Sequence, residues 1–438
     1  MQLISPKLYF YLFSFTFQIL ILVLPLIFIP NIFNPYEFPK FIFFVIAAEL
    51  LAMFFTLYWL SGKNKETIFP RMDLGVFLVV GFGLINLISD LFGVNPMASI
   101  LGNNFRHQGF ITLISGIVIF ILLRSPLIFK KILPIFRKTA LASAFLISSF
   151  AIWEVIQINI FHNYTIATYN SRIVGTLGNP NFLGGYLAML LPFVLWYPQK
   201  FKKPLLMYIV KLAAVFVIIL TIFFTDSTSS LIVIAFIISA YFIRLFMKIP
   251  LPKFMLIAIL LLIFWVGSGE FIKSISRNLT LNQSIILKDE KRCFGNWPQN
   301  YPLKIITDIR RTRAIFFKRD SPCDSRLLIW TNGLNSLFKH PILGFGQDSF
   351  ESLMPKGTTY IVDNAHNIFL ETAVSSGLIG LFFYLLILAH SLRKSSLDIK
   401  MSLITFIIIG QFNPLSIAQI SLFWTLLGLS QKVDVKSS

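Results

Sequence analysis

Two basic side chains lie where chemistry on an anionic substrate would be possible. His366 lies in the polar segment 363–367, directly before a long apolar stretch. An imidazole can take up a proton near neutral pH, so His366 is a candidate general base. Arg326 lies at the start of the amphipathic helix expected over 324–338, where the helix dipole disfavours a cation unless an anion binds there too. The plainer interpretations are an interfacial hydrogen bond for His366 and an ion pair with Asp324 for Arg326.

Four further polar residues complete the candidate site. Arg106 and Arg172 are the only Lys or Arg in two short loops between apolar stretches. Glu371 lies unusually close to lipid, so its carboxylate should face protein or water. We expect Arg106, Arg172, Asn367 and Glu371 to bind substrate. Arginine binds phosphate without a metal, and the sequence has no HExxH, CxxC or P-loop pattern, so neither a metal nor a cofactor is expected.

The composition predicts the elements that hold these residues. Of the 438 residues, 56% are hydrophobic and 13% are charged, which is far more apolar than a soluble domain. The apolar residues form blocks of about 20, the length of a helix that crosses a bilayer. We therefore predict an all-α integral membrane protein with about twelve transmembrane helices, at 9–29, 41–61, 73–92, 109–128, 140–160, 182–198, 205–225, 229–247, 252–268, 367–390, 401–412 and 415–430.

The placement of positive charge predicts the topology. With the N-terminus inside, twenty Lys and Arg fall in cytoplasmic segments, and the short outer loops hold only Lys40, Arg106 and Arg172. This bias is the positive-inside signal, so both termini are expected in the cytoplasm and the long loop 269–366 outside. The net charge of +19 is then mostly a topology signal, and no nucleic-acid partner is expected.

The long outer loop divides the chain between the ninth and tenth predicted helices. Its polar part, 276–322, has no periodicity and no function that we can assign. Cys293 and Cys323 would form a disulfide if the outer side is oxidising, and the alternative is two free thiols. The expected organisation is six helices over 1–204, a core with the outer loop over 205–392, and two helices with a cytoplasmic tail over 393–438.

The stretches "SRLLIWTNGLNSLFKHPILGFGQDSF" and "AHNIFLETAVSSGLIGLFFY" resemble the signature region of the O-antigen ligase/O-antigen polymerase superfamily. In these proteins a large periplasmic loop leads into a membrane helix with the pattern H-[NSQ], nine residues, G-x-x-[GTY]. Here His366-Asn367 is followed after nine residues by Gly377 and Gly380. The strong resemblance covers about 325–385, and "GTLGNPNFLGGYLA" and "GVNPMASILGNNFRHQG" are also similar to recurrent elements of the superfamily.

The resemblance implies a metal-independent glycosyltransferase of polysaccharide biosynthesis in the bacterial cell envelope, placed in the inner membrane. Its donor would be a glycan on undecaprenyl pyrophosphate, and its acceptor a hydroxyl of a glycan, lipid or protein. By the same resemblance, His366 would be the general base and Arg326 a clamp for the pyrophosphate. Ligase, polymerase and protein O-glycosylation are not separated by these residues.

One departure from the superfamily pattern concerns the helix before the outer loop. Many members carry a Ser-Arg pair at its outer end, whereas this chain has Ser229-Ser230 and no arginine there. Arg172 and Arg106 are the candidates to replace it. Two other functions remain open: a transporter or flippase of lipid-linked sugars, which would show ionisable groups and broken helices near the bilayer midplane, and a scaffold that binds anionic polymer.

Overall fold

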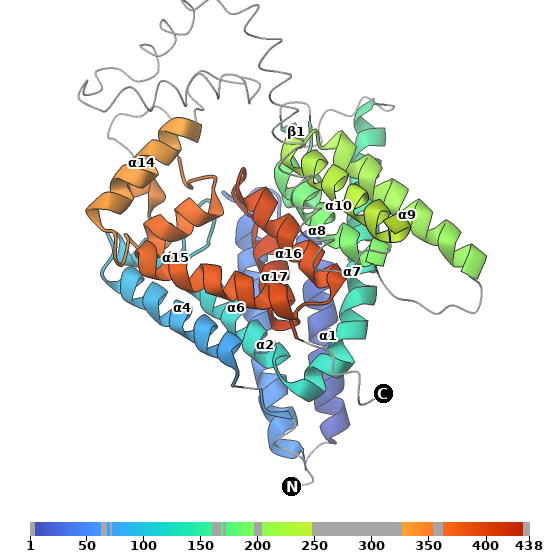
Figure 1. Ribbon diagram of the computed structural model, residues 1–438, viewed down its shortest axis with the longest axis horizontal. Coiled ribbons are helices and arrows are strands. Elements are labelled where there is room, and N and C mark those ends of the chain that lie inside the picture. Colours follow the sequence, from blue (N-terminus) through green and yellow to red (C-terminus); the bar gives the residue numbers. More distant parts are fainter. Residues whose placement is uncertain are drawn as a thin grey trace, which may run out of the picture.

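The computed structural model describes residues 5–62, 68–70, 72–159, 168–169, 172–196, 204–247, 326–353 and 362–431. Within these residues the chain is mostly helical (Figure 1). The elements are α1 (Pro6–Val23), η1 (Leu24–Leu26), α2 (Glu37–Ser61), α4 (Leu74–Leu91), α5 (Pro96–Leu101), α6 (Phe110–Leu123), α7 (Pro126–Asn159), β1 (Thr168–Tyr169), β2 (Arg172–Ile173), η2 (Gly175–Leu177), α8 (Pro180–Trp196), α9 (Pro204–Phe224), α10 (Thr228–Met247), α14 (Arg326–Lys339), η3 (Phe350–Leu353), α15 (Ile368–Lys394), α16 (Leu397–Gly410) and α17 (Ile417–Gly428).

The predicted all-α membrane class is confirmed. The segment Pro6–Leu26 and helices α2, α4, α7 and α15 are long and apolar enough to cross a membrane, and shorter apolar helices accompany them. A described helix overlaps eleven of the twelve predicted ranges, so the number of spans stays a prediction. The ninth range, 252–268, lies outside the described residues, as do the segment 276–322 and both cysteines.

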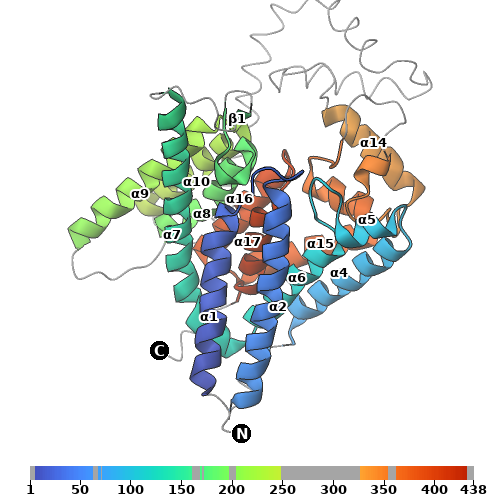
Figure 2. The same ribbon diagram turned by 180° about the vertical axis from the view of Figure 1, so that it is seen from behind.

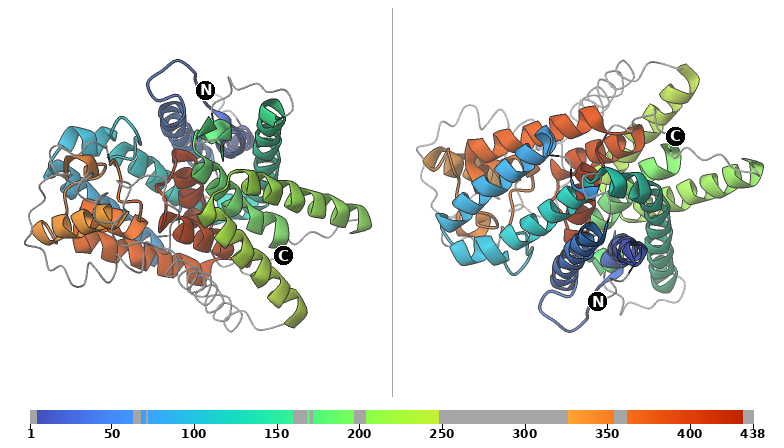
Figure 3. Two further views of the ribbon diagram at one scale, coloured as in Figure 1. Left: turned by 90° about the horizontal axis from the view of Figure 1, so that it is seen from above. Right: turned by 90° about the horizontal axis from the view of Figure 1, so that it is seen from below.

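Helix α8 is buried along nearly its whole length. The views along the bundle show α4, α14 and α15 on the side of the molecule opposite α9 and α10 (Figure 3). A helix that is apolar on all sides belongs in the interior, and α8 packs against α7, α9, α10 and α16. Helix α7 begins at Pro126, so the predicted span 140–160 is only the later part of a 34-residue helix. The amphipathic helix expected over 324–338 is α14, which buries Ile329 and Leu337 but leaves Leu334 47% exposed.

The bundle has two polar ends, which we call upper and lower as they stand in Figure 1. The start of α1 and the end of α2 lie at the lower end, and β1 and α14 lie at the upper end (Figures 1 and 2). At the lower end, Arg124 pairs with Asp73 and donates to the Ser430 carbonyl oxygen at 2.9 Å. This contact joins the last residues of the described chain to the end of α6 and the start of α4.

Lys40 is a buried residue of α2, which corrects its expected place in an outer loop. Its side chain is 0% exposed, and Nζ donates to the carbonyl oxygens of Ile27 at 2.7 Å and Thr176 at 2.8 Å. Three carbonyl acceptors, with Tyr36 as the third at 3.1 Å, replace the water that a cation would otherwise bind. Lys40 therefore fastens the connection after α1 to the connection before α8.

Helix α15 is broken at Gly377, where φ is +68° and ψ is −174°. The turn that follows α14 enters this break. Phe345 N–H donates to the Val374 carbonyl oxygen at 2.9 Å, and Gly346 N–H donates to the Ser375 carbonyl oxygen at 2.9 Å. Non-helical backbone at membrane depth requires such protein partners, because lipid offers none. The break therefore depends on the turn that fills it.

Gly377 is the first glycine of the G-x-x-G part of the superfamily pattern. A Cβ at this position would collide with the carbonyl group of Ile342, and the positive φ is strained for any other residue. Small residues in membrane helices usually permit close helix–helix packing. In this structure Gly377 instead allows the backbone of residues 340–346 to approach α15 closely.

We predict that Gly377→Ala lowers the thermal unfolding midpoint of the detergent-purified protein. The left-handed backbone alone costs on the order of 1–3 kcal/mol for a residue with a Cβ, and the collision with Ile342 adds to this. Gly333→Ala in α14 is the matched control, because its nearest neighbour is a terminal methyl group of Leu370 at 3.1 Å. An unchanged midpoint for Gly377→Ala would show that the α15 break does not require glycine.

Candidate functional site

The backbone of His366 is held in a left-handed turn at the upper end of α15, with φ of +53°. Its N–H donates to Asn364 Oδ1 at 2.8 Å. The neighbouring Ala365 is fixed twice: its N–H donates to Glu371 Oε2 at 2.6 Å, and its carbonyl oxygen accepts from Trp330 Nε1 of α14 at 2.9 Å. A strained backbone persists only when its surroundings determine it, so α14 and α15 together set the position of His366.

Asn367 and Glu371, both predicted to bind substrate, are positioned by this same turn. Asn367 caps α15, because its Oδ1 accepts from the N–H groups of Phe369 at 3.1 Å and Leu370 at 3.0 Å. Its Nδ2 donates to Gln411 Oε1 at 3.1 Å, which joins the start of α15 to the end of α16. The Glu371 carboxylate binds Ala365 on one side and faces the cavity described below on the other.

Arg106 reaches the His366 loop through Asp363. The Arg106 Nε lies 2.6 Å from Asp363 Oδ2, and Nη2 lies 3.3 Å from Oδ1, so the pair is bidentate. Both side chains are largely covered, at 15% and 14% exposure, and the guanidinium lies over the ring of Phe182 at 5.4 Å. The structure thus brings Arg106 next to the segment 363–367, 257 residues along the chain.

Asp348 connects the Arg106 loop to the segment that precedes α15. Its Oδ2 accepts from the N–H groups of Asn103 at 2.9 Å and Gln108 at 2.7 Å. Burial is the largest influence on this carboxyl group and raises its pKa to about 6, against the lowering effect of the two N–H donors. The charge of Asp363 also raises the pKa, and Arg106 lowers it.

Arg172 lies at the α9–α10 turn, beside the Ser229-Ser230 pair that lacks the expected arginine. Its Nε donates to the Thr225 carbonyl oxygen at 2.7 Å, and Nη2 donates to the Asp226 carbonyl oxygen at 3.0 Å. Helix α10 begins at Thr228, so a guanidinium here lies next to the free amides of a helix start. Arg172 therefore lies beside the helix end at which the superfamily pattern has an arginine, and its role as a replacement stays a prediction.

Arg326 is the first residue of α14, as the amphipathic pattern predicted. Its side chain lies outside the described part of the structure, so its role as an anion clamp stays a prediction. Among the residues that the structure describes, no group of three or more His, Cys, Asp and Glu side chains could hold a metal ion.

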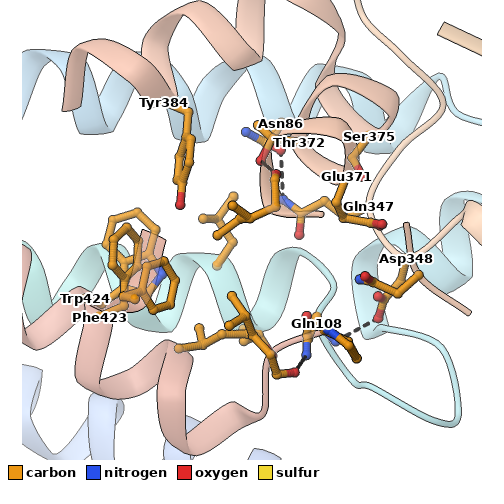
Figure 4. Close-up of a pocket in the computed structure, with 18 of the residues that line it drawn as sticks. Asn86, Gln108, Gln347, Asp348, Glu371, Thr372, Ser375, Tyr384, Phe423 and Trp424 are labelled. Atoms are coloured by element: carbon orange, nitrogen blue, oxygen red, sulfur yellow. Dashed lines mark hydrogen bonds between the residues drawn. The ribbon is translucent and has the colours of Figure 1, made fainter. Parts of the chain in front are cut away.

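A cavity of about 150 Å³ opens between α4, α6, α15 and α17 (Figure 4). It is lined by residues of these helices, of α16 and of the polar loops at their upper ends: Phe82, Asn86, Gln108, Thr112, Leu113, Gln347, Asp348, Asn364, Ile368, Glu371, Thr372, Ser375, Tyr384, Phe406, Asn413, Pro414, Leu415, Ile420, Phe423 and Trp424. Of the predicted site residues, only Glu371 lines it. Asn364, two residues before His366, also lines the cavity, as does Asp348.

Sequence reasoning missed the amide side chains of this cavity. Gln108 and Gln347 occur in the quoted stretches "NNFRHQG" and "GFGQDSF", but neither residue type suggests catalysis by itself. Gln108 Nε2 donates to the Leu415 carbonyl oxygen at 2.5 Å, and the Gln347 side-chain amide lies 2.9 Å from that of Asn86. These pairs join positions more than 250 residues apart, which one sequence cannot reveal.

We predict that Asp348 makes the stability of the protein depend on pH. Because the folded protein raises this pKa from 3.8 to about 6, the protonated form is favoured by folding. The stabilisation is complete below pH 3.8 and is lost as the pH rises through about 6. The unfolding midpoint of the wild-type protein, relative to Asp348→Asn, should therefore fall between pH 4 and pH 6.5 and stay level above about pH 7.

Asp348→Ala separates this charge effect from the loss of an acceptor. It leaves two N–H groups without their carboxylate, and each buried unpaired group costs roughly 1–3 kcal/mol. We expect a lower midpoint at every pH for this variant, measured in the same detergent buffer series. Parallel pH profiles for the wild type and Asp348→Asn would contradict the assignment of the slope to Asp348.

Comparison with known proteins indicates a family for the region that contains this site. A family model described as O-antigen ligase matches residues 212–385, which include α10, α14 and the first part of α15. No curated protein matches the chain. The matched region holds His366, Asp363, Asp348 and the Arg172-bound α9–α10 turn. The match supports the O-antigen ligase/polymerase superfamily for this chain, as the resemblance of residues 325–385 implied.

Proposed function

We propose that the protein is a membrane glycosyltransferase that transfers or polymerises a glycan from undecaprenyl pyrophosphate to an acceptor hydroxyl. The family match supports a membrane protein that transfers or ligates glycans. The observation that carries the finer proposal is the convergence of His366, Arg106 and Arg172 at one end of the bundle. This end would face outward in the topology expected from charge, with both termini in the cytoplasm and twelve spans.

The reaction would be a displacement at the anomeric carbon of the donor sugar. His366 takes the proton of the acceptor hydroxyl, whose oxygen forms the new glycosidic bond. The bond between the anomeric carbon and the pyrophosphate oxygen breaks, and the electron pair leaves with the lipid pyrophosphate. Arg326 and Arg172 would stabilise that developing charge, which needs donors fixed in advance. The hydrogen bonds from Arg172 to the Thr225 and Asp226 carbonyl oxygens and to Asn181 Oδ1 provide such fixation.

Asn367, Glu371 and Arg106, which we propose to bind substrate, also hold the turn that carries His366. The Asn367 cap and the Glu371–Ala365 bond hold the turn that carries His366. Arg106, neutralised in part by Asp363, holds that turn from the opposite side of the site. The partners would be a lipid-linked glycan, an acceptor glycan, lipid or protein, and the surrounding membrane lipid.

A transporter of lipid-linked sugars would also use a broken helix, and α15 is broken. However, the break is filled by the backbone of residues 341–346, so the freed carbonyl groups do not face a passage for substrate. The transferase proposal is therefore preferred, and the variant tests below distinguish the two.

We predict that His366→Ala lowers the transfer rate by about 10²- to 10⁴-fold without a loss of expression. The measurement is the surface-glycan gel profile of a deletion strain that carries each variant, followed by transfer from undecaprenyl-pyrophosphate-linked glycan in detergent. His340→Ala is the matched control, because His340 is exposed and its ring packs edge-on against Phe345. A normal glycan profile for His366→Ala would remove the general base and favour transport.

We predict that Arg172→Lys impairs the enzyme through the donor. Lysine keeps the charge but loses the planar fork that binds phosphate in two places. The KM for the lipid-linked donor should rise more than the KM for the acceptor, while the unfolding midpoint stays near that of the wild type. Equal changes in both KM values, or a fall in the midpoint alone, would show that Arg172 only supports the α9–α10 turn.

A further inference from the structure

The cavity beside the His366 loop has a charge character opposite to that of the arginine positions. Its described lining includes two carboxylates, Asp348 and Glu371, and no Lys, Arg or His. A pyrophosphate would find no cationic partner there and would lie beside two acidic side chains. The cavity is therefore unsuited to the anionic part of a lipid-linked substrate, although it lies next to the residues that would hold that part.

The polar side of the cavity is rich in side-chain amides. Asn86, Gln108, Gln347, Asn364 and Asn413 all line it, and four of them, Asn86, Gln347, Asn364 and Asn413, are at least nine-tenths buried. An amide offers donors and an acceptor together, which matches a hydroxyl group that both donates and accepts. Each of these amides already makes at least one hydrogen bond within the protein, which fixes its orientation and leaves its other donor or acceptor positions for ligand hydroxyls.

The other side of the cavity is aromatic. Tyr384, Phe423 and Trp424 face the polar side across the open space (Figure 4). Aromatic faces pack against the apolar C–H face of a ring while the opposite wall binds polar groups. A ligand that fits both walls has hydroxyl groups on its edges and C–H groups on a face.

Tyr384 has a hydroxyl group that the protein leaves unsatisfied. The residue is 5% exposed, and its Oη has no hydrogen-bond partner. Figure 4 shows the hydroxyl end of Tyr384 directed into the cavity. Buried polar atoms normally have partners, so this hydroxyl is a position where a ligand atom is expected.

The size of the cavity limits the ligand. One water molecule requires about 10–15 Å³ of such space, so about 150 Å³ holds on the order of ten water-sized groups. This is the size of one monosaccharide ring. A glycan of several residues does not fit inside, and it would have to continue outward past the polar loops at the upper end.

We propose that this cavity is a subsite for one uncharged sugar residue, bound through the amides of Asn86, Gln108 and Gln347, the Tyr384 hydroxyl and the Trp424 face. The inference rests on the proposed function for the origin of the sugar. It assigns the sugar to the cavity and the pyrophosphate to the arginines outside it. The sugar belongs either to the donor next to its pyrophosphate or to the end of the acceptor, and both have the same chemistry.

The test uses Tyr384→Phe, which removes only the unsatisfied hydroxyl. We expect this variant to be as stable as the wild type or more stable, because a buried polar atom without a partner is removed. Its affinity for a sugar should fall by roughly three- to tenfold, the effect of one hydrogen bond. Thr372→Leu, which adds bulk to the cavity wall, should abolish sugar binding.

Tyr186→Phe is the matched control. The Tyr186 hydroxyl is buried in the core, 3.3 Å from Ser143 Oγ and away from the cavity. This variant should lose stability because Ser143 loses a partner, and it should bind sugar as the wild type does. The two Tyr→Phe variants are thus expected to show opposite patterns of stability and binding.

Binding is measured on the full-length protein in detergent with methyl α-glycosides of glucose, galactose, rhamnose and N-acetylglucosamine. The readout is the rise in unfolding midpoint with concentration, relative to the same concentration of sorbitol. A saturable rise for at least one glycoside that weakens in Tyr384→Phe and disappears in Thr372→Leu supports the subsite. No saturable rise for any glycoside, or equal rises in all variants, overturns it.

A transfer assay with the lipid-linked donor keeps this result separate from the proposed function. Glycoside binding without transfer by the wild type would retain the subsite and reject the glycosyltransferase. Transfer by the wild type without Tyr384-dependent glycoside binding would retain the glycosyltransferase and reject the subsite. Where both hold, inhibition by the bound glycoside identifies the source of the sugar, because it competes either with the donor or with the acceptor.

Discussion

Buried carboxylates that accept backbone N–H groups hold the upper end of this protein together. Glu371 accepts from Ala365, Asp348 from Asn103 and Gln108, Asp90 from Gln347, Glu154 from Val174 and Gly175, and Glu37 from Ile417, all within 2.6–3.2 Å. The donors lie on loops between helices, where the N–H groups have no helical partner. Near a membrane these groups cannot rely on water, so the loops keep their shape only because a carboxylate meets them.

At the break in α15, backbone carbonyl oxygens instead of carboxylates accept the N–H groups of a loop. Its carbonyl oxygens at Val374 and Ser375 accept from Phe345 and Gly346, and Ser89 Oγ donates to Ser375 at 3.1 Å. The turn that fills the break continues into Gln347 and Asp348, which line the cavity. The break in α15 thus places the loop residues Gln347 and Asp348 in the same cavity as Glu371.

The sequence predicted the parts of the fold that depend on local pattern. Apolar length located the helices, helical spacing located α14, and the His366–Gly377 spacing located the segment that the O-antigen ligase match includes. The buried place of Lys40 was not predicted, because its three carbonyl partners come from separate segments, one of them 136 residues away. The cavity was missed for the same reason. Asn86 and Gln347 meet across 261 residues, and neither position has a local pattern that marks it.

The separation of charges at the upper end explains how one site could treat the two halves of a lipid-linked sugar differently. Arg106 and Arg172 are fixed by partners in the loops of the upper end, whereas the carboxyl groups of Asp348 and Glu371 line the cavity. A phosphate moved into the cavity would lose its cations, and a sugar moved to the arginines would leave the Tyr384 hydroxyl unpaired. In either case a polar or charged group lacks its partner in surroundings of low dielectric, where the free-energy cost of an unpaired group is highest. The bond between sugar and pyrophosphate would therefore be held across the boundary between the two regions, close to the turn that carries His366.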